Sequence, residues 1–127
     1  MPITSSVHAS GKIIVLTLSS PYTADDWRAA VRDVLADPAF HEHPAVLVDR
    51  SGADPPSPAF VDTLVEAVGT FANAMAHARV AILVADRLAF GMARMGVTKF
   101  ELRRGGPPMA VFCEEAAAVA WLHSDAR

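Results

Sequence analysis

Alternating and helical patterns of apolar residues divide the N-terminal part of the chain into two strands and a helix. Residues 3–9 place Ile3, Ser5 and Val7 on one face and the polar Thr4, Ser6 and His8 on the other, which suits a half-exposed strand. Residues 12–18 are apolar on both faces, which predicts a central strand covered on both sides. Because only a short turn at Gly11 separates the two segments, they predict an antiparallel hairpin.

A capped helix follows the hairpin. Thr23 and Asp26 have the spacing of a capping box, which predicts a helix that begins after Thr23. One apolar stripe at helical spacing then follows, made of Trp27, Ala30, Val31, Val34 and Leu35. Asp37 and Pro38 end this helix, and we expect residues 40–44 to form a polar linker.

The rest of the chain alternates short apolar runs with amphipathic segments. The runs 45–48, 80–84 and 109–112 predict buried parallel strands, the last one after a glycine-proline turn at 105–108. Ser57 followed by Pro58 is typical of a helix start, and the apolar side of this second helix extends to Met75. Asp86 predicts a third helix over 87–98, and residues 114–122 predict a closing helix.

The predicted order, β-β-α-β-α-β-α-β-α, defines an α/β fold. We expect a single-layer mixed sheet, an antiparallel N-terminal hairpin plus parallel strands, with helices packed on it. The crossovers between parallel strands should be right-handed. The whole chain, residues 1–127, is expected to form one domain.

Composition indicates a folded protein and excludes several classes. Of the 127 residues, 52% are hydrophobic and 20% are charged, which is enough for a core. A net charge of −3 provides no basic field for nucleic acid, and no apolar run approaches the ~20 residues of a membrane-spanning helix. Because the N-terminus lacks a basic and then apolar leader, we expect a cytoplasmic protein without integral membrane contact.

The single cysteine permits no internal disulfide framework. Cys113 lies near the start of the closing helix, where the helix dipole favours a thiolate, but Glu114 and Glu115 oppose that charge. We therefore expect Cys113 to be a small buried side chain.

Two stretches carry a resemblance to a known family. Residues 46–52 (VLVDRSG) look like the strand and loop before the regulatory helix of STAS-like proteins, and residues 88–95 (LAFGMARM) are similar to their third-helix segment. In its order of elements, nearly the whole chain resembles the small prokaryotic proteins of this superfamily, which includes the anti-sigma-factor antagonists. The resemblance implies a STAS-like fold and a regulatory domain that acts by binding another protein.

The phosphorylation motif of those antagonists is only partly present. In the family, a partner kinase phosphorylates a serine or threonine of an Asp-Ser-Ser/Thr-Gly motif at the start of the second helix. Here residues 49–58 are DRSGADPPSP, so the motif is not intact, although Ser57 has the corresponding place. A phosphate on Ser57 would face the unsatisfied amides of the helix N-terminus. Capping alone accounts for a serine before Pro58, and we expect capping.

Polar side chains follow two of the predicted parallel strands. In open α/β sheets, ligands gather at the carboxyl ends of the strands. The candidate binding or regulatory residues of these two loops are Asp49, Arg50, Ser51, Asp54, Ser57, Asp86 and Arg87. They either converge on a site or form a solvated rim of opposite charges, and Arg94 either joins them or faces solvent.

The third predicted helix carries more apolar residues than one face can hold. Phe90, Met92 and Met95 share it with Leu88 and Val97. Either part of this surface stays exposed and binds a partner, or the whole helix is buried on the sheet. We include Phe90 and Met92 among the candidate binding residues.

Catalytic and metal-binding motifs are absent from the sequence. It contains no GxSxG, HExxH or P-loop, so we expect neither catalysis nor a cofactor. An enzyme that uses Asp49 or Asp86 would need one of these carboxyls in a cleft. His41 and His43 would point the same way in an extended linker, but two imidazoles do not complete a tetrahedral site, and we expect no bound metal.

These observations lead to one functional hypothesis and one alternative. The first is a non-enzymatic domain that binds a protein partner through the 49–57 loop, the start of the second helix and the third helix. The alternative, implied by the fold relationship to CRAL-TRIO domains, is a small-molecule or lipid-binding module. Its pocket would be lined by Phe60, Leu64, Phe71, Phe90 and Met92. A homodimer is compatible with both, because a second copy can cover an apolar helix face.

Overall fold

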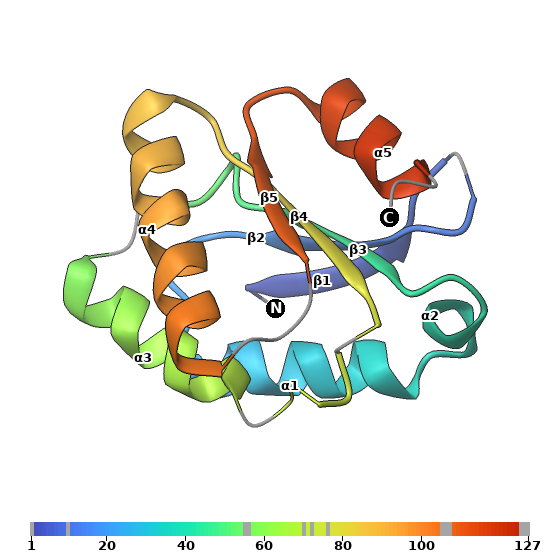
Figure 1. The fold of residues 1–127 in the computed structure, drawn as a ribbon, viewed down its shortest axis with the longest axis horizontal. Coiled ribbons are helices and arrows are strands. Elements are labelled where there is room, and N and C mark those ends of the chain that lie inside the picture. Colours follow the sequence, from blue (N-terminus) through green and yellow to red (C-terminus); the bar gives the residue numbers. More distant parts are fainter. Residues whose placement is uncertain are drawn as a thin grey trace.

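Five strands form a single mixed sheet (Figure 1). The computed structural model describes residues 2–9, 11–54, 57–69, 71, 73–75, 77–104 and 108–124, apart from the side chains of residues 68, 103 and 104. The strands are β1 (Ile3–Val7), β2 (Ile14–Leu18), β3 (Ala45–Asp49), β4 (Arg79–Leu83) and β5 (Met109–Phe112). They lie in chain order, with β1 antiparallel to β2 and the other pairs parallel. The predicted hairpin and mixed sheet are confirmed.

Helices connect the parallel strands and close the chain. They are α1 (Ala24–Ala36), α2 (Pro38–Glu42), α3 (Pro58–Gly69), α4 (Arg87–Arg104) and α5 (Glu115–His123). The capping box is present at α1, where Thr23 accepts a hydrogen bond from the amide of Asp26 and Asp26 accepts one from that of Thr23. Among the residues described, no helix is both long and apolar enough to cross a membrane.

The strand order determines which face each helix covers. Right-handed crossovers between neighbours that advance in one direction place all connecting helices on the same face. Accordingly, buried residues of β2, β3 and β4 on that face pack against α1, with α3 and α4 beside it. The chain is free to cross over after β5, and α5 covers the opposite face, where Ala118 and Leu122 pack against Leu47 and Ala81. Figure 1 shows α5 set apart from α1, α3 and α4.

Three predicted segments differ from the structure. Residues 38–42 form the helix α2 rather than a polar linker, because Asp37 caps it at the amide of Ala39 and Phe40 is buried in the core. The second predicted helix ends at Gly69, a residue with low helix propensity, so Phe71 and Met75 lie in turns. The third predicted helix extends beyond residue 98 to residue 104. Ala72 and residues 105–107 lie outside the described residues.

The predicted cysteine environment is wrong. Cys113 is exposed. It lies between the end of β5, which is an edge strand, and Glu114, the N-cap of α5, and it belongs to neither face of the core. A free thiol at the edge of a sheet has no core to enter.

Candidate functional site

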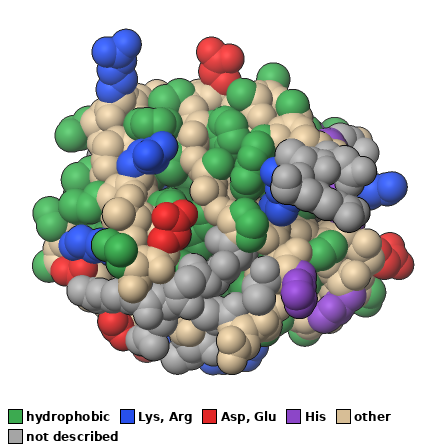
Figure 2. All heavy atoms as spheres, viewed as in Figure 1, with side chains coloured by type: hydrophobic (Ala, Val, Ile, Leu, Met, Phe, Trp, Pro, Cys, Tyr) green, Lys and Arg blue, Asp and Glu red, His purple; other side chains and the backbone are tan. Residues whose placement is uncertain are grey.

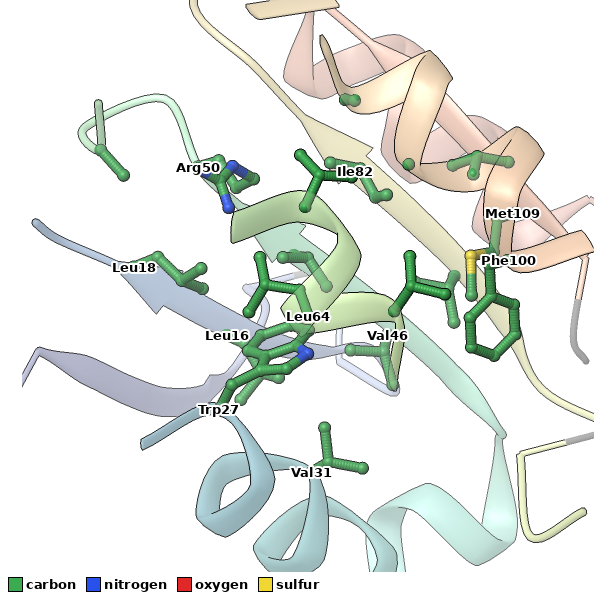
Figure 3. Close-up of a pocket in the computed structure, with 18 of the residues that line it drawn as sticks. Leu16, Leu18, Trp27, Val31, Val46, Arg50, Leu64, Ile82, Phe100 and Met109 are labelled. Carbon is green, nitrogen blue, oxygen red and sulfur yellow. The ribbon is translucent and has the colours of Figure 1, made fainter. Parts of the chain in front are cut away.

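An apolar cavity lies between the sheet and the three connecting helices. The helix α3 packs mainly against α1 and α4, which lie on the sheet on either side of it. A cavity of about 150 Å³ remains beneath α3 (Figure 3). Its lining comprises Leu16, Leu18, Tyr22, Trp27, Val31, Val34, Val46, Val48, Arg50, Ala53, Val61, Leu64, Val65, Met75, Val80, Ile82, Ala89, Met92, Ala93, Gly96, Val97, Phe100 and Met109.

The position of α3 is fixed by its contact with α4. Gly96 of α4 lies so close to α3 that a Cβ atom there would be 3.3 Å from Cγ1 of Val61. On the outer side of the same contact, the ammonium group of Lys99 lies 2.8 Å from a carboxylate oxygen of Asp62. Gly96 has no side chain, so α3 can approach α4 closely, and the ion pair links the two helices. In this position α3 covers the cavity.

One charged side chain reaches the lining, and it lies at one end of the cavity (Figure 3). Arg50 follows β3 directly, whereas Phe100 and Met109 lie at the opposite end of the cavity (Figure 3). Apart from Arg50, only Tyr22 and Trp27 bring polar side-chain atoms to the described lining. The cavity is therefore an apolar chamber with one cationic end, at the carboxyl ends of the parallel strands.

The Arg50 guanidinium is held by neutral partners. Its backbone amide donates to the carbonyl of Leu83, 2.8 Å away, which ties the start of this loop to β4. The guanidinium donates to the hydroxyl of Tyr22 and, at 3.1 Å, to the carbonyl of Asp54, and its carbon lies 5.5 Å from the Tyr22 ring centre. Within the described part of the chain, no carboxylate forms an ion pair with it.

Two consequences follow for this half-buried arginine. A guanidinium has five N–H donors, and two of its donor atoms are occupied by the bonds just described. Its positive charge is not neutralised by a described neighbour, so an anionic group of a ligand would be favoured beside it.

The other predicted residues of this loop have local structural contacts. Oδ1 of Asp49 accepts hydrogen bonds from the amide and the hydroxyl of Ser51, at 2.9 and 2.6 Å. The amide of Asp54 donates to the hydroxyl oxygen of Ser20, 2.9 Å away. Ser57 is exposed and caps α3, with its hydroxyl oxygen 3.2 Å from the amide of Phe60. The predicted capping role of Ser57 is thus present.

The loop after β4 lies at the same edge of the sheet but does not join this cluster. Oδ1 of Asp86 accepts from the amide of Ala89 at 2.9 Å and so caps α4, and Arg87 is exposed in the first turn. Among the described residues, no ion pair or hydrogen bond connects either side chain with Arg50. Of the predicted charged cluster, the structure brings only Arg50 to the cavity.

The three candidates on α4 separate onto different sides of the helix. Met92 lines the cavity, Phe90 packs against Val84 and Val97 outside the lining, and Arg94 is exposed on the side of β5. Of the other predicted lining residues, Leu64 contributes and Phe60 and Phe71 do not. Phe60 instead packs against the ring of Tyr22, with ring centres 5.7 Å apart.

The two histidines near α2 do not share a site. Nε2 of His41 lies 2.7 Å from the carbonyl of Leu35, whereas the ring of His43 stacks on that of His123, with centres 5.9 Å apart. Burial lowers the pKa of His43, and the charges of His123 and Lys12 lower it further. No group of three or more side chains suited to hold a metal occurs among the residues that the structure describes.

Among the lining residues with polar side-chain atoms, Tyr22 and Trp27 were not identified from the sequence. Tyr22 lies 28 positions before Arg50, and nothing in their spacing indicates that the hydroxyl and the guanidinium meet. Trp27 belongs to the predicted apolar stripe of α1, but the stripe does not distinguish a residue in the packed core from one beside a cavity.

Comparison with known proteins identifies the fold. No family model and no curated protein matches the chain. Among solved structures, an uncharacterised protein of the DUF3478 family from Shewanella loihica PV-4, described as having a SpoIIAA-like fold, superposes with a TM-score of 0.60. The alignment covers 94% of this chain and 91% of that one, at 15% identity, a level at which the likeness shows the fold alone. The chain therefore has a SpoIIAA-like fold, which confirms the STAS-like α/β fold expected from its sequence.

Proposed function

We propose that this protein is a binding module for a small apolar ligand that carries an anionic group. The observation that carries the proposal is Arg50, whose guanidinium has no described carboxylate partner, at the end of an otherwise apolar cavity. The apolar part of a ligand would be buried against apolar side chains in this cavity. Its carboxylate would pair with the remaining N–H donors of the guanidinium. The partner of this proposal is a small molecule, the alternative raised by the sequence.

The cavity volume limits the size of the ligand. About 150 Å³ is less than the ~300–1,000 Å³ typical of sites for drug-sized ligands. It is comparable with apolar cavities that accept a benzene-sized molecule. We therefore propose a short aliphatic or aromatic acid, with its apolar part beneath α3 and its carboxylate at Arg50.

A series of isosteric ligands tests this proposal. Hexanoate, 1-hexanol and hexylamine share one apolar chain and differ in the charge of the end group. We expect calorimetric titration to give the tightest binding for hexanoate and the weakest for hexylamine. In the Arg50→Gln variant, hexanoate should bind about 10-fold more weakly or worse, because a hydrogen bond to a charged group contributes ~1.5–3 kcal/mol.

The alcohol is the internal control. Its affinity should be the same in the wild-type protein and in Arg50→Gln, which shows that the cavity remains intact in the variant. Equal binding of all three ligands, or an equal loss of hexanoate and 1-hexanol binding in the variant, would contradict the proposed role of Arg50.

A regulatory protein partner is the second candidate function. It is favoured by exposed groups at the same edge of the sheet, where Ser51, Ser57 and Leu88 follow β3 and β4. A photoreactive residue in place of Leu88 should then crosslink one defined protein in the native host. The same residue in place of Val7, which is 56% exposed on the edge strand β1, serves as the control. Identical crosslinking patterns from both positions would contradict this candidate.

A further inference from the structure

The outward side of α4 carries large apolar side chains that the fold does not cover. Leu88 and Leu102 are 70% and 83% exposed, and with Val7 they are the most exposed large hydrophobic residues of the part described. The helix lies at the periphery of the molecule in Figure 1. Figure 2 shows hydrophobic side chains spread over this side of the surface.

These residues have the spacing of a helix-pairing seam. Leu88, Met95 and Leu102 recur every seven residues, and Gly91 and Thr98 lie between them. A seven-residue repeat with a second position three residues on keeps one line of side chains facing a neighbouring helix. We call these five residues the outer seam. Over its 14-residue span it is about 21 Å long, at ~1.5 Å per residue.

Except for Thr98, which also borders the groove between α4 and β5, the outer seam lies apart from the surfaces that α4 uses within the fold. Ala89, Ala93 and Val97 face the cavity, and Lys99 pairs with Asp62 of α3. Of the seam itself, only Met95 is half-buried, against the cluster around Val61 and Phe100.

The charged residues beside the outer seam favour a second copy of α4 as the partner. Along one flank, seven residues apart, lie Arg87, Arg94 and Glu101, all exposed. This flank is basic in the first half of α4 and acidic in the second. Two copies of α4 in antiparallel orientation bring this flank of each copy against the same flank of the other, with Arg94 of one beside Glu101 of the other. The flank is therefore self-complementary about a two-fold axis, as an isologous interface requires.

The shape of the seam agrees with the same arrangement. Gly91 is exposed, and the place where its Cβ would lie borders open space, so it presents no side chain to a second helix. In an antiparallel pair whose axis passes near residues 96–97, Leu102 of each copy lies over Gly91 of the other. We propose that two copies of the chain associate through the outer seam as an antiparallel helix pair.

Sedimentation velocity of the full chain tests this proposal. The wild-type mass should rise from 13.5 kDa towards twice that value as the concentration increases. Because the interface is short, we expect a dissociation constant on the order of 1–100 μM. Leu102→Asp should raise this constant at least ~10-fold, whereas the control variant Val7→Asp, at another exposed apolar position, should leave it unchanged.

Charge reversal tests the orientation without removing apolar contacts. Arg94→Glu and Glu101→Arg should each weaken the dimer about 3- to 10-fold. The double variant should restore wild-type association, because it exchanges the two charges. Circular dichroism of each variant verifies folding.

Three results would overturn the proposal. They are a monomer at all concentrations up to ~0.5 mM, a dimer that Leu102→Asp does not weaken, and a double variant no better than the single ones. If Leu102→Asp fails to fold, the charge variants decide alone, because all three exchange exposed side chains.

Discussion

Filling the cavity beneath α3 should stabilise the protein and abolish ligand binding. Ala93 lies on the inner face of α4 and lines the cavity. The substitution Ala93→Leu adds three carbon atoms, which can enter the open space beneath α3. A ligand can no longer occupy that space, so gain of stability and loss of binding should occur together.

The structure sets the magnitude. An empty volume of about 150 Å³ costs ~3.6 kcal/mol at ~24 cal/mol per Å³, which is the upper limit of what filling can recover. Three newly buried carbon atoms contribute ~2.4 kcal/mol at ~0.8 kcal/mol each. Strained rotamers reduce this gain. We expect the free energy of unfolding to rise by about 1–2 kcal/mol, and the melting temperature by about 3–8 °C.

Urea unfolding and hexanoate titration measure the two effects in the same preparations. Ala117→Leu is the control, because Ala117 is exposed on α5 and a leucine there should change stability by less than ~0.5 kcal/mol. A loss of more than ~1 kcal/mol in Ala93→Leu would show that the space beneath α3 is already filled. A stabilised variant that still binds hexanoate would place the ligand elsewhere.

Three further predictions concern the capping, the core and the pH dependence. Thr23→Ala removes the side-chain cap of α1 and should lower the free energy of unfolding in urea by about 1 kcal/mol. Leu47→Ala creates a cavity where the sheet meets α5, at a residue with 0% exposure, and should cost about 2–5 kcal/mol in the same assay. Because burial lowers the pKa of His43, the folded state binds fewer protons there than the unfolded chain. The free energy of unfolding should therefore fall as the pH drops below about 6.5. Between pH 8 and pH 5 it should fall more in the wild-type protein than in His43→Gln. If the free energy of unfolding changes equally with pH in the two proteins, the pH dependence does not come from His43.

The candidate site could be predicted only in part. Arg50 was identified because it follows a buried parallel strand, and the edge where such strands end is a general place for ligands. Its neighbours at that edge have other roles, since Asp49 binds Ser51 and Asp86 caps α4. Short polar side chains in turns and at helix starts satisfy nearby amides first, and a sequence does not show which charge is left over.

The sequence by itself determined the order and type of the main elements. The capping residue Thr23 and the short runs of β-branched residues act over a few neighbouring positions, so their effects are visible in a linear chain. The sequence prediction was wrong where tertiary packing decided the local conformation. At α2, a polar linker was predicted, but burial of Phe40 favours a helical turn over an extended segment.

Only the tertiary structure decided the cavity and the outer seam. The contact between Gly96 and Val61, 35 positions apart, fixes α3 on α4 and leaves space beneath it. The same packing decides which apolar residues of α4 face inward, as Val97 does, and which remain in solvent, as Leu102 does. Apolar periodicity shows that a helix has faces to bury, but the volume between its neighbours depends on how distant segments meet, and no local pattern encodes that distance.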